Sequence, residues 1–230
     1  MFLKVYIADI APLYDEATYE YYYSKSIPFR QKKADRFKFQ KLRSQSIGAG
    51  ILLKKALENL GIPKNVWEFT TVKTGKVRLS EAKELRIDFN LSHSEDRAMC
   101  VISDCEVGCD VEKIQAHTEI ADRFFTEHEA ALAHDDADMF TRIWTLKESF
   151  IKTTGEGLGR GLNSFEICFE EDGMGKLRAK RLKGDGIIPE KFSLYELNYD
   201  DGYKYSVCVK GTEIVPEAEW VDLSLPIGLR

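Results

Sequence analysis

Two short apolar segments, residues 98–103 and 107–111, are separated by a polar turn. This pattern predicts an antiparallel hairpin, because short apolar runs bounded by turn residues form strands. A strong amphipathic helix is expected over residues 139–153, where large apolar side chains recur at helical spacing. The chain must therefore combine strands with helices, although the pattern does not specify their arrangement.

Other segments carry the same two signals. Apolar runs predict further strands at residues 2–10, 66–72, 87–91, 165–169, 192–197 and 205–209. Helices are also expected at residues 30–43, 45–60 and 120–133. In the first of these helices, Phe37 and Leu42 are expected to face inward. The two halves of the chain have a similar order of elements, but no sequence repeat is strong enough to prove a duplication.

Composition excludes several classes of protein. Of 230 residues, 43% are hydrophobic and 31% are charged, which is typical of a globular protein and not of a disordered chain. No apolar run approaches the ~18 residues that span a bilayer, and the first residues lack the pattern of a secretory signal. Five cysteines, an odd number, indicate reduced thiols in a cytoplasmic protein. Cys100, Cys105 and Cys109 are expected to be small buried hydrophobes.

Charge is distributed unevenly along the chain. The net charge is −5, which argues against a general nucleic-acid binder. Residues 24–55 nevertheless carry ten Lys or Arg and one acidic residue, whereas residues 116–140 carry seven acidic residues and one Arg. The basic segment is either an anion-binding surface or a solvated helix face.

Asp110 and Glu112 alternate with Cys109 and Val111 in the second strand of the predicted hairpin. Alternate residues of a strand share a face, so the two carboxylates are expected to lie together, away from the apolar pair. Two adjacent carboxylates repel each other unless a cation or a proton intervenes, and magnesium is the simplest such cation. The alternative is a solvated strand edge.

Glu148 and Lys152 are four residues apart in the predicted helix and therefore lie on one face. They could form an ordinary surface ion pair. However, Trp144 lies one turn earlier on the same face, which places the pair beside an apolar patch. Glu148 is therefore a candidate third carboxylate for the magnesium site.

Ser92 and His93 lie at the end of the strand predicted near residues 87–91. Both side chains could donate hydrogen bonds to phosphate oxygens. The alternative is that they cap a turn.

Together these segments resemble the 4′-phosphopantetheinyl transferase family, of the larger Sfp type. The resemblance rests on residues 89–94 (FNLSHS), 108–113 (GCDVEK) and 144–152 (WTLKESFIK), and it covers about residues 25–209. It implies an α+β fold of two similar subdomains in a pseudo-two-fold arrangement, residues 1–115 and 116–230, with coenzyme A in the cleft between them.

The resemblance also implies an activity and a set of site residues. In that family three carboxylates hold magnesium, a role that falls here on Asp110, Glu112 and Glu148. Phosphopantetheine would move from coenzyme A to a serine of an apo acyl or peptidyl carrier protein, with release of 3′,5′-ADP. The positions that match coenzyme A contacts of the family are Arg30, Lys33, Ser46, Lys76, Ser92 and His93. Cys109 departs from the usual Val or Ile, but it is expected to face away from the metal.

If the resemblance holds, Glu148 is the expected base for the carrier serine, and Lys152 is the expected hydrogen-bond donor to the leaving phosphate. The apolar part of residues 120–133, including Phe124 and Phe125, resembles the carrier-docking region. A monomer that binds neither nucleic acid nor membranes is expected. Two alternatives are a coenzyme A or carrier-protein binding module without turnover, and a nucleic-acid binder that uses the basic segment, which the acidic segment disfavours. The sequence does not indicate which carrier is modified.

Overall fold

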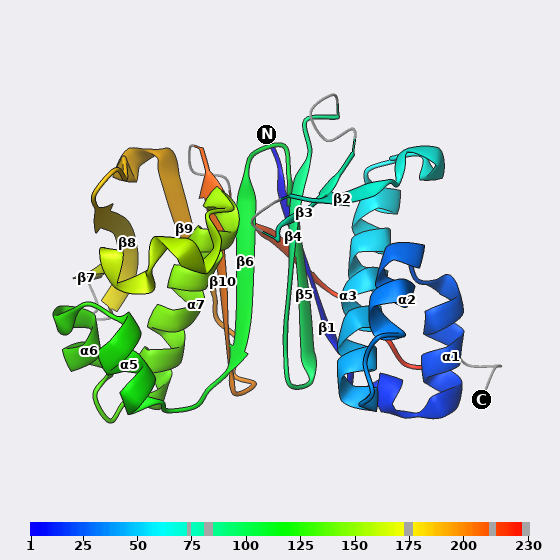
Figure 1. Ribbon diagram of the computed structural model, residues 1–230, viewed down its shortest axis with the longest axis horizontal. Coiled ribbons are helices and arrows are strands. Elements are labelled where there is room, and N and C mark those ends of the chain that lie inside the picture. The colour runs from blue at the N-terminus through cyan, green and yellow to red at the C-terminus, as the bar shows by residue number, and fades with distance from the viewer. Residues whose placement is uncertain (73–74, 81–84, 173–176, 212–214, 227–230) are drawn as a thin grey trace.

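Two sheets pack face to face in the centre of the molecule, and helices cover their outer sides (Figure 1). The computed structural model describes residues 1–72, 75–80, 85–172, 177–211 and 215–226. Helices α1–α3, within residues 16–59, lie on one side of the strands, and α5–α7, within residues 118–154, lie on the other (Figure 1). The α+β class expected from the resemblance is confirmed.

The strands are short and mostly antiparallel. The first sheet has the order β11-β1-β5-β4 and the second the order β6-β10-β9. Their strands are β1 (Leu3–Asp9), β4 (Asp88–Ser94), β5 (Arg97–Ser103), β6 (Val107–Lys113), β9 (Phe192–Leu197), β10 (Tyr203–Lys210) and β11 (Glu217–Trp220). Two small hairpins are formed by β2 (Phe69–Thr71) with β3 (Val77–Leu79), and by β7 (Phe165–Glu171) with β8 (Leu177–Gly184). The helices are α1 (Glu16–Lys25), α2 (Pro28–Ala34), α3 (Gln40–Asn59), α5 (Thr118–Phe124), α6 (Glu127–Ala133) and α7 (Ala137–Thr154).

The two halves have the same topology. In each half a first strand, β1 or β6, is followed by helices, a small hairpin and two further strands. The three main strands pair in the order first, last, middle: β1-β5-β4 in one half and β6-β10-β9 in the other. This shared order confirms the two similar subdomains. By its hydrogen bonds β6 belongs with the second half, and the division of the chain at residue 115 stays a prediction.

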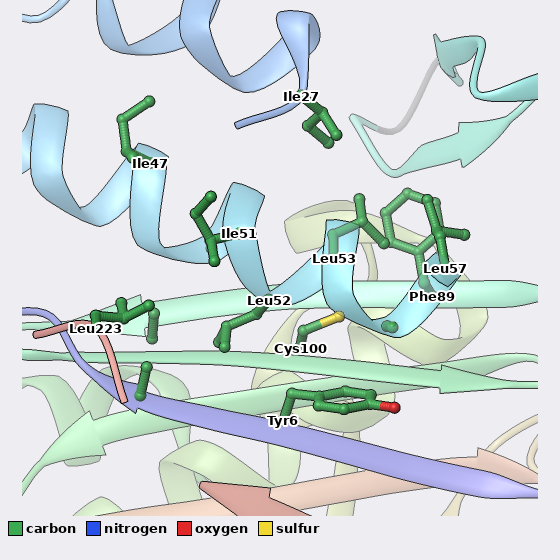
Figure 2. Packing of buried hydrophobic residues seen from close by; sticks show 14 of the residues in the cluster. Tyr6, Ile27, Ile47, Ile51, Leu52, Leu53, Leu57, Phe89, Cys100 and Leu223 are labelled. Carbon is green, nitrogen blue, oxygen red and sulfur yellow. The ribbon is translucent and has the colours of Figure 1, made fainter. Parts of the chain in front are cut away.

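Each half has its own helix-to-sheet core, and a third core joins the sheets. In the first half, α3 places Leu52 over the sheet, near Tyr6 and Cys100, whereas Leu53 lies beside Leu57 and Phe89 (Figure 2). The core between the sheets includes Val5, Met99, Val101, Val107, Cys109, Val111 and Val207. This buried layer fixes the two sheets relative to each other, since burying apolar surface is the main stabilising contribution to folding.

Several boundaries differ from the sequence prediction. The helix expected over 30–43 ends at Ala34, and the next helix starts at Gln40, so Leu42 belongs to α3 and is exposed at 37% of its surface instead of facing inward. The amides of residues 36 and 37 donate to the carbonyls of residues 33 and 34, and these turn hydrogen bonds end α2. No glycine or proline marks the end of the helix in the sequence. The helix expected over 120–133 is also two helices, because Thr126 and Glu129 form a capping box that starts α6.

The strand expected over 66–72 is shorter, because residues 64–66 form a 3-10 turn before β2 begins. All five cysteines are free, but Cys105 is only half-buried, unlike Cys100 and Cys109. Across the described ranges, no helix is long and apolar enough to cross a bilayer.

Candidate active site

The carboxylates of β6 lie where the two halves meet. Asp110 is 2% exposed and Glu112 is half-buried, and both line one cavity of about 450 Å³. Cys109 and Val111 point to the opposite side and are fully buried in the core between the sheets. The alternation expected for this strand is therefore confirmed, and the solvated-edge alternative is wrong for Asp110.

Polar side chains of β4 join the two sheets along this seam. Asp88 accepts a hydrogen bond from the Val107 amide at 3.0 Å, and Asn90 accepts one from the Cys109 amide at 3.1 Å. The Ser92 hydroxyl donates to Asp110 Oδ1 at 2.6 Å, and the Ser94 hydroxyl donates to Glu112. Residues two positions apart share a strand face, so these four side chains form one row along β4. The row connects β4 to β6, which are not joined by backbone hydrogen bonds of a sheet. Sequence reasoning gave no role to Asp88, Asn90 or Ser94, although Asn90 and Ser94 lie in the segment 89–94 that it singled out.

Helix α7 brings Glu148 and Lys152 to the same cavity. The Lys152 ammonium lies 2.6 Å from Asp110 Oδ1 and 3.3 Å from the Ser92 hydroxyl. The pair is thus not an ordinary surface ion pair, because Lys152 bonds to a buried carboxylate on another element. The three carboxylates named from the sequence all line this one cavity.

Gly108 allows α7 to lie directly against β6. A Cβ atom at this position would lie 2.3 Å from the Ser149 carbonyl oxygen and 2.5 Å from the Thr153 amide nitrogen. Both distances are shorter than any van der Waals contact between such atoms, so only glycine fits without movement of the helix. The glycine of the motif therefore sets how close Lys152 comes to Asp110.

We expect Gly108→Ala to lower both stability and turnover. Overpacking of this kind costs about 1–3 kcal/mol of unfolding free energy, and displacement of α7 would separate Glu148 and Lys152 from Asp110. Urea unfolding and kcat measure the two effects. Gly159→Ala is the matched control, because nothing lies within 4 Å of the added Cβ there. Equal behaviour of the two variants would contradict the close-approach argument.

Burial dominates the electrostatics of the site. It raises the pKa of Glu112 to about 7, helped by the nearby charge of Asp110. It also raises the pKa of Glu148, against the opposing effect of Lys152. His93, which lines the same cavity, has its pKa lowered to about 4 by burial and by the charges of Arg30, Lys33 and Lys152. His93 is therefore a neutral ring at neutral pH and has one N–H to donate.

The donor set suits a hard divalent cation. Asp110 Oδ2 is buried and has no hydrogen-bond partner, which is costly for a carboxylate oxygen unless a cation binds it. Magnesium prefers such oxygens, together with phosphate oxygens of a substrate. Among the residues described, no three His, Cys, Asp or Glu side chains are arranged as a preformed metal site. The residues thus fit the cation chemically, without a closed cage.

A second cavity, of about 440 Å³, adjoins the first and shares Leu91, Glu148 and Lys152 with it. Arg30 and Lys33 line this cavity from α2. The Arg30 guanidinium is 4% exposed, donates through Nε to the Ser46 carbonyl at 3.0 Å, and leaves Nη2 buried without a partner. Burial lowers the pKa of Arg30 to about 10, so the group stays charged at neutral pH. An unpaired buried guanidinium beside a cavity is suited to an anion.

Two other expected contacts point elsewhere. Ser46 is buried, its hydroxyl donates to the Arg30 carbonyl, and it lines neither of these two cavities. Lys76 lines the second cavity, but its ammonium bonds to Asp88 at 2.5 Å and to the Val107 carbonyl at 2.9 Å. Lys76 thus ties the β2–β3 hairpin to the seam between the sheets. A phosphate contact from either residue stays a prediction.

Sequence reasoning also missed a buried ion pair behind the site. Lys147, the residue before Glu148, and Glu129 of α6 are completely buried, with their charged atoms 2.7 Å apart. The Lys147 ammonium also donates to the carbonyls of Leu162 and Phe165. A Lys and a Glu 18 positions apart on different helices give no periodic signal, so only the tertiary structure reveals this pair.

Comparison with known proteins identifies the family. The model of the 4′-phosphopantetheinyl transferase superfamily matches residues 106–208, which include all three carboxylates. The chain is 31% identical over 188 residues to the 4′-phosphopantetheinyl transferase Sfp of Bacillus subtilis (strain 168), covering 79% of this chain and 80% of that protein. It is 29% identical over 219 residues to the 4′-phosphopantetheinyl transferase psf-1 of Bacillus pumilus, covering 90% of each.

A human relative matches as well. The L-aminoadipate-semialdehyde dehydrogenase-phosphopantetheinyl transferase of Homo sapiens is 30% identical over 205 residues, which cover 80% of this chain and 66% of the human protein. The sequence motifs, the repeated topology and these matches agree. The chain belongs to the Sfp-type 4′-phosphopantetheinyl transferase family.

Proposed function

We propose that this protein transfers the 4′-phosphopantetheine group from coenzyme A to a serine of an apo acyl or peptidyl carrier protein, leaving 3′,5′-ADP. The observation that carries the proposal is the meeting of Asp110, Glu112, Glu148 and Lys152 at the boundary of two adjoining cavities. One cavity is lined by three carboxylates, and the other by basic groups, of which Arg30 is buried and Lys33 exposed. A substrate with a pyrophosphate between two organic groups matches this arrangement.

In this proposal coenzyme A lies between the two halves. Its phosphates face Arg30 and Lys33, and its pyrophosphate lies near Lys152 and the carboxylates. Ser92 is held by Asp110 and Lys152, whereas His93 lines the carboxylate cavity as a neutral donor. Magnesium, held by Asp110, Glu112 and Glu148, would neutralise phosphate charge during transfer.

The transfer needs a base and a donor. In the proposal, the Glu148 carboxylate takes the proton of the carrier serine as that oxygen bonds to phosphorus. The support for this role is that Glu148 lines both cavities. The P–O bond to the 3′,5′-ADP moiety breaks, and Lys152 donates a hydrogen bond to the leaving phosphate. Phosphoryl transfer depends mainly on positioning and charge neutralisation, which these side chains supply.

The carrier is proposed to approach past Phe124 and Trp144, which line the carboxylate cavity together with Ser92 and His93. A smaller cavity of about 140 Å³ beside it is lined by Ile120, Phe140 and Trp144 among others, giving an apolar surface next to the site. Phe125, by contrast, is buried in the core of α5–α7 and supports this surface from beneath. The proposal places the protein in the cytoplasm as a monomer that binds neither nucleic acid nor membranes.

A screen of apo-carrier proteins with coenzyme A tests the proposal. We expect at least one carrier to gain the mass of one phosphopantetheine group, with 3′,5′-ADP as the second product. Binding of coenzyme A with no mass gain on any carrier tested would favour the binding-module alternative. The same screen identifies the carrier.

Removal of divalent ions should abolish turnover. Three carboxylates line one cavity, and without a cation they repel both each other and the substrate phosphates. We expect EDTA to stop transfer and added magnesium to restore it, measured as carrier mass gain over time. Full activity in a thoroughly chelated buffer would contradict the metal assignment.

The basic cavity should recognise the 3′-phosphate of coenzyme A. We expect Lys33→Met and Arg30→Met to weaken coenzyme A binding by about 1–3 kcal/mol, the size of a charge-assisted hydrogen bond. Binding of dephospho-coenzyme A, which lacks that phosphate, should change much less. Calorimetric titration with both ligands measures the difference. Equal losses would show that the basic segment acts only as a general positive surface.

A further inference from the structure

Lys152 is bound to Asp110, one of the three carboxylates of the site. Its ammonium lies 2.6 Å from Asp110 Oδ1, and the Ser92 hydroxyl donates to the same oxygen. Asp110 Oδ1 therefore accepts two hydrogen bonds, while the buried Oδ2 accepts none. The Lys152 side chain is 28% exposed and Asp110 only 3%, so the lysine is the more accessible partner of the pair.

The ammonium affects all three carboxylates. It pairs directly with Asp110, and Glu112 and Glu148 line the same cavity as the ammonium. A divalent ion on these carboxylates would face this positive charge at close range. Like charges in a poorly solvated site repel strongly, so an ion at Oδ2 and the ammonium at Oδ1 would compete for the same carboxylate.

Lys152 also has a second position available to it. It lines both cavities, and the neighbouring cavity contains the anion-binding groups Arg30 and Lys33. A flexible lysine stem lets the ammonium turn from Asp110 toward a phosphate without movement of the helix. A phosphate oxygen there would replace the hydrogen bond that the ammonium gives up.

We propose that Lys152 is an exchangeable counter-ion, which blocks divalent-ion binding in the free protein until the phosphates of coenzyme A draw its ammonium away from Asp110. This inference rests on the proposed function and adds an order of binding to it. The metal and coenzyme A would bind cooperatively, and the free protein would hold the metal weakly. Coupling of this kind is reciprocal, so each ligand should raise the affinity for the other.

Manganese binding to the free protein tests the proposal. Mn²⁺ also takes oxygen ligands, and its unbound form is quantified by electron paramagnetic resonance. We expect Lys152→Met, freed of nucleotide, to bind Mn²⁺ at least about tenfold more tightly than wild type, because a charge-assisted hydrogen bond no longer competes. Lys152→Gln, which also lacks the charge but keeps a polar end, should behave alike and serves if the Met variant folds poorly.

Two matched variants locate the effect. Lys152→Arg keeps the cation and should bind Mn²⁺ as weakly as wild type. The double variant Lys152→Met/Asp110→Asn should lose the Mn²⁺ affinity that Lys152→Met gained, because that gain is expected to arise at Asp110. Unchanged Mn²⁺ affinity in both neutral variants, or a gain that persists without Asp110, would overturn the proposal.

Addition of coenzyme A tests whether its phosphates draw the Lys152 ammonium away from Asp110. It should raise the Mn²⁺ affinity of wild type by a larger factor than that of Lys152→Met, in which the ammonium is already absent. Equal factors would show that the phosphates do not displace Lys152. None of these measurements needs turnover. If the wild-type protein modifies a carrier but does not show these Mn²⁺ affinities, the proposed function stands and only the exchange of Lys152 is wrong. If no carrier is modified, the result counts against the proposed function alone.

Discussion

Glu148→Gln is expected to lower kcat by about 10²–10⁴-fold, the contribution typical of a positioned general base. A serine hydroxyl is a poor nucleophile until its proton is removed. Glutamine keeps the size of the side chain and one oxygen ligand but cannot accept that proton. Coenzyme A affinity should stay within several-fold of wild type, because the phosphates are proposed to bind mainly to Arg30, Lys33 and Lys152.

Asp110→Asn is the comparison that separates the two roles of a carboxylate. Asp110 is proposed to act as a ligand only, so raised magnesium should restore part of its lost activity. The measurement is kcat as a function of magnesium concentration for both variants. Full rescue of Glu148→Gln by excess magnesium would mean that Glu148 is a third ligand and that the base lies elsewhere.

The local geometry of the site could be predicted from the sequence because it depends on the periods of regular structure. Two-residue alternation placed Asp110 and Glu112 on one face of β6, and a four-residue spacing placed Glu148 and Lys152 on one face of α7. The meeting of these two faces depends on the topology of the second half, in which β6 and α7 pack together. Periodicity contains no such information, and the convergence was expected only from the family resemblance.

Other features could not be predicted for the same reason. The role of Gly108 depends on backbone atoms of α7 about forty residues later in the chain. The row of polar residues along β4 has a function only because β6 lies beside it without a backbone ladder. Lys76 was predicted as a substrate contact because its position matches the family, whereas in this structure it bonds to Asp88 and a backbone carbonyl. The break between α2 and α3 has no glycine or proline to announce it.

The buried pair Lys147–Glu129 should contribute strongly to stability once one partner is removed. Glu129 accepts hydrogen bonds from the Ile167 amide at 2.8 Å and from the Thr126 amide at 3.0 Å, in addition to the ion pair. It therefore joins α6, α7 and β7. In Lys147→Met this carboxylate would stay buried with no counter-charge, which typically costs about 3–5 kcal/mol.

Lys54–Glu58 on α3 provides the matched control for this prediction. Its charged atoms are also 2.7 Å apart, but the side chains are 26% and 39% exposed, so Lys54→Met should cost less than about 1 kcal/mol. The double variant Glu129→Gln/Lys147→Met should recover part of the stability lost in Lys147→Met. It removes the uncompensated charge, and the glutamine carbonyl oxygen can still accept a hydrogen bond from one of the two backbone amides. Urea unfolding of the three variants gives the free energies. Equal losses for Lys147→Met and Lys54→Met would show that burial does not determine the contribution of the pair, since the distance between the charges is the same in both.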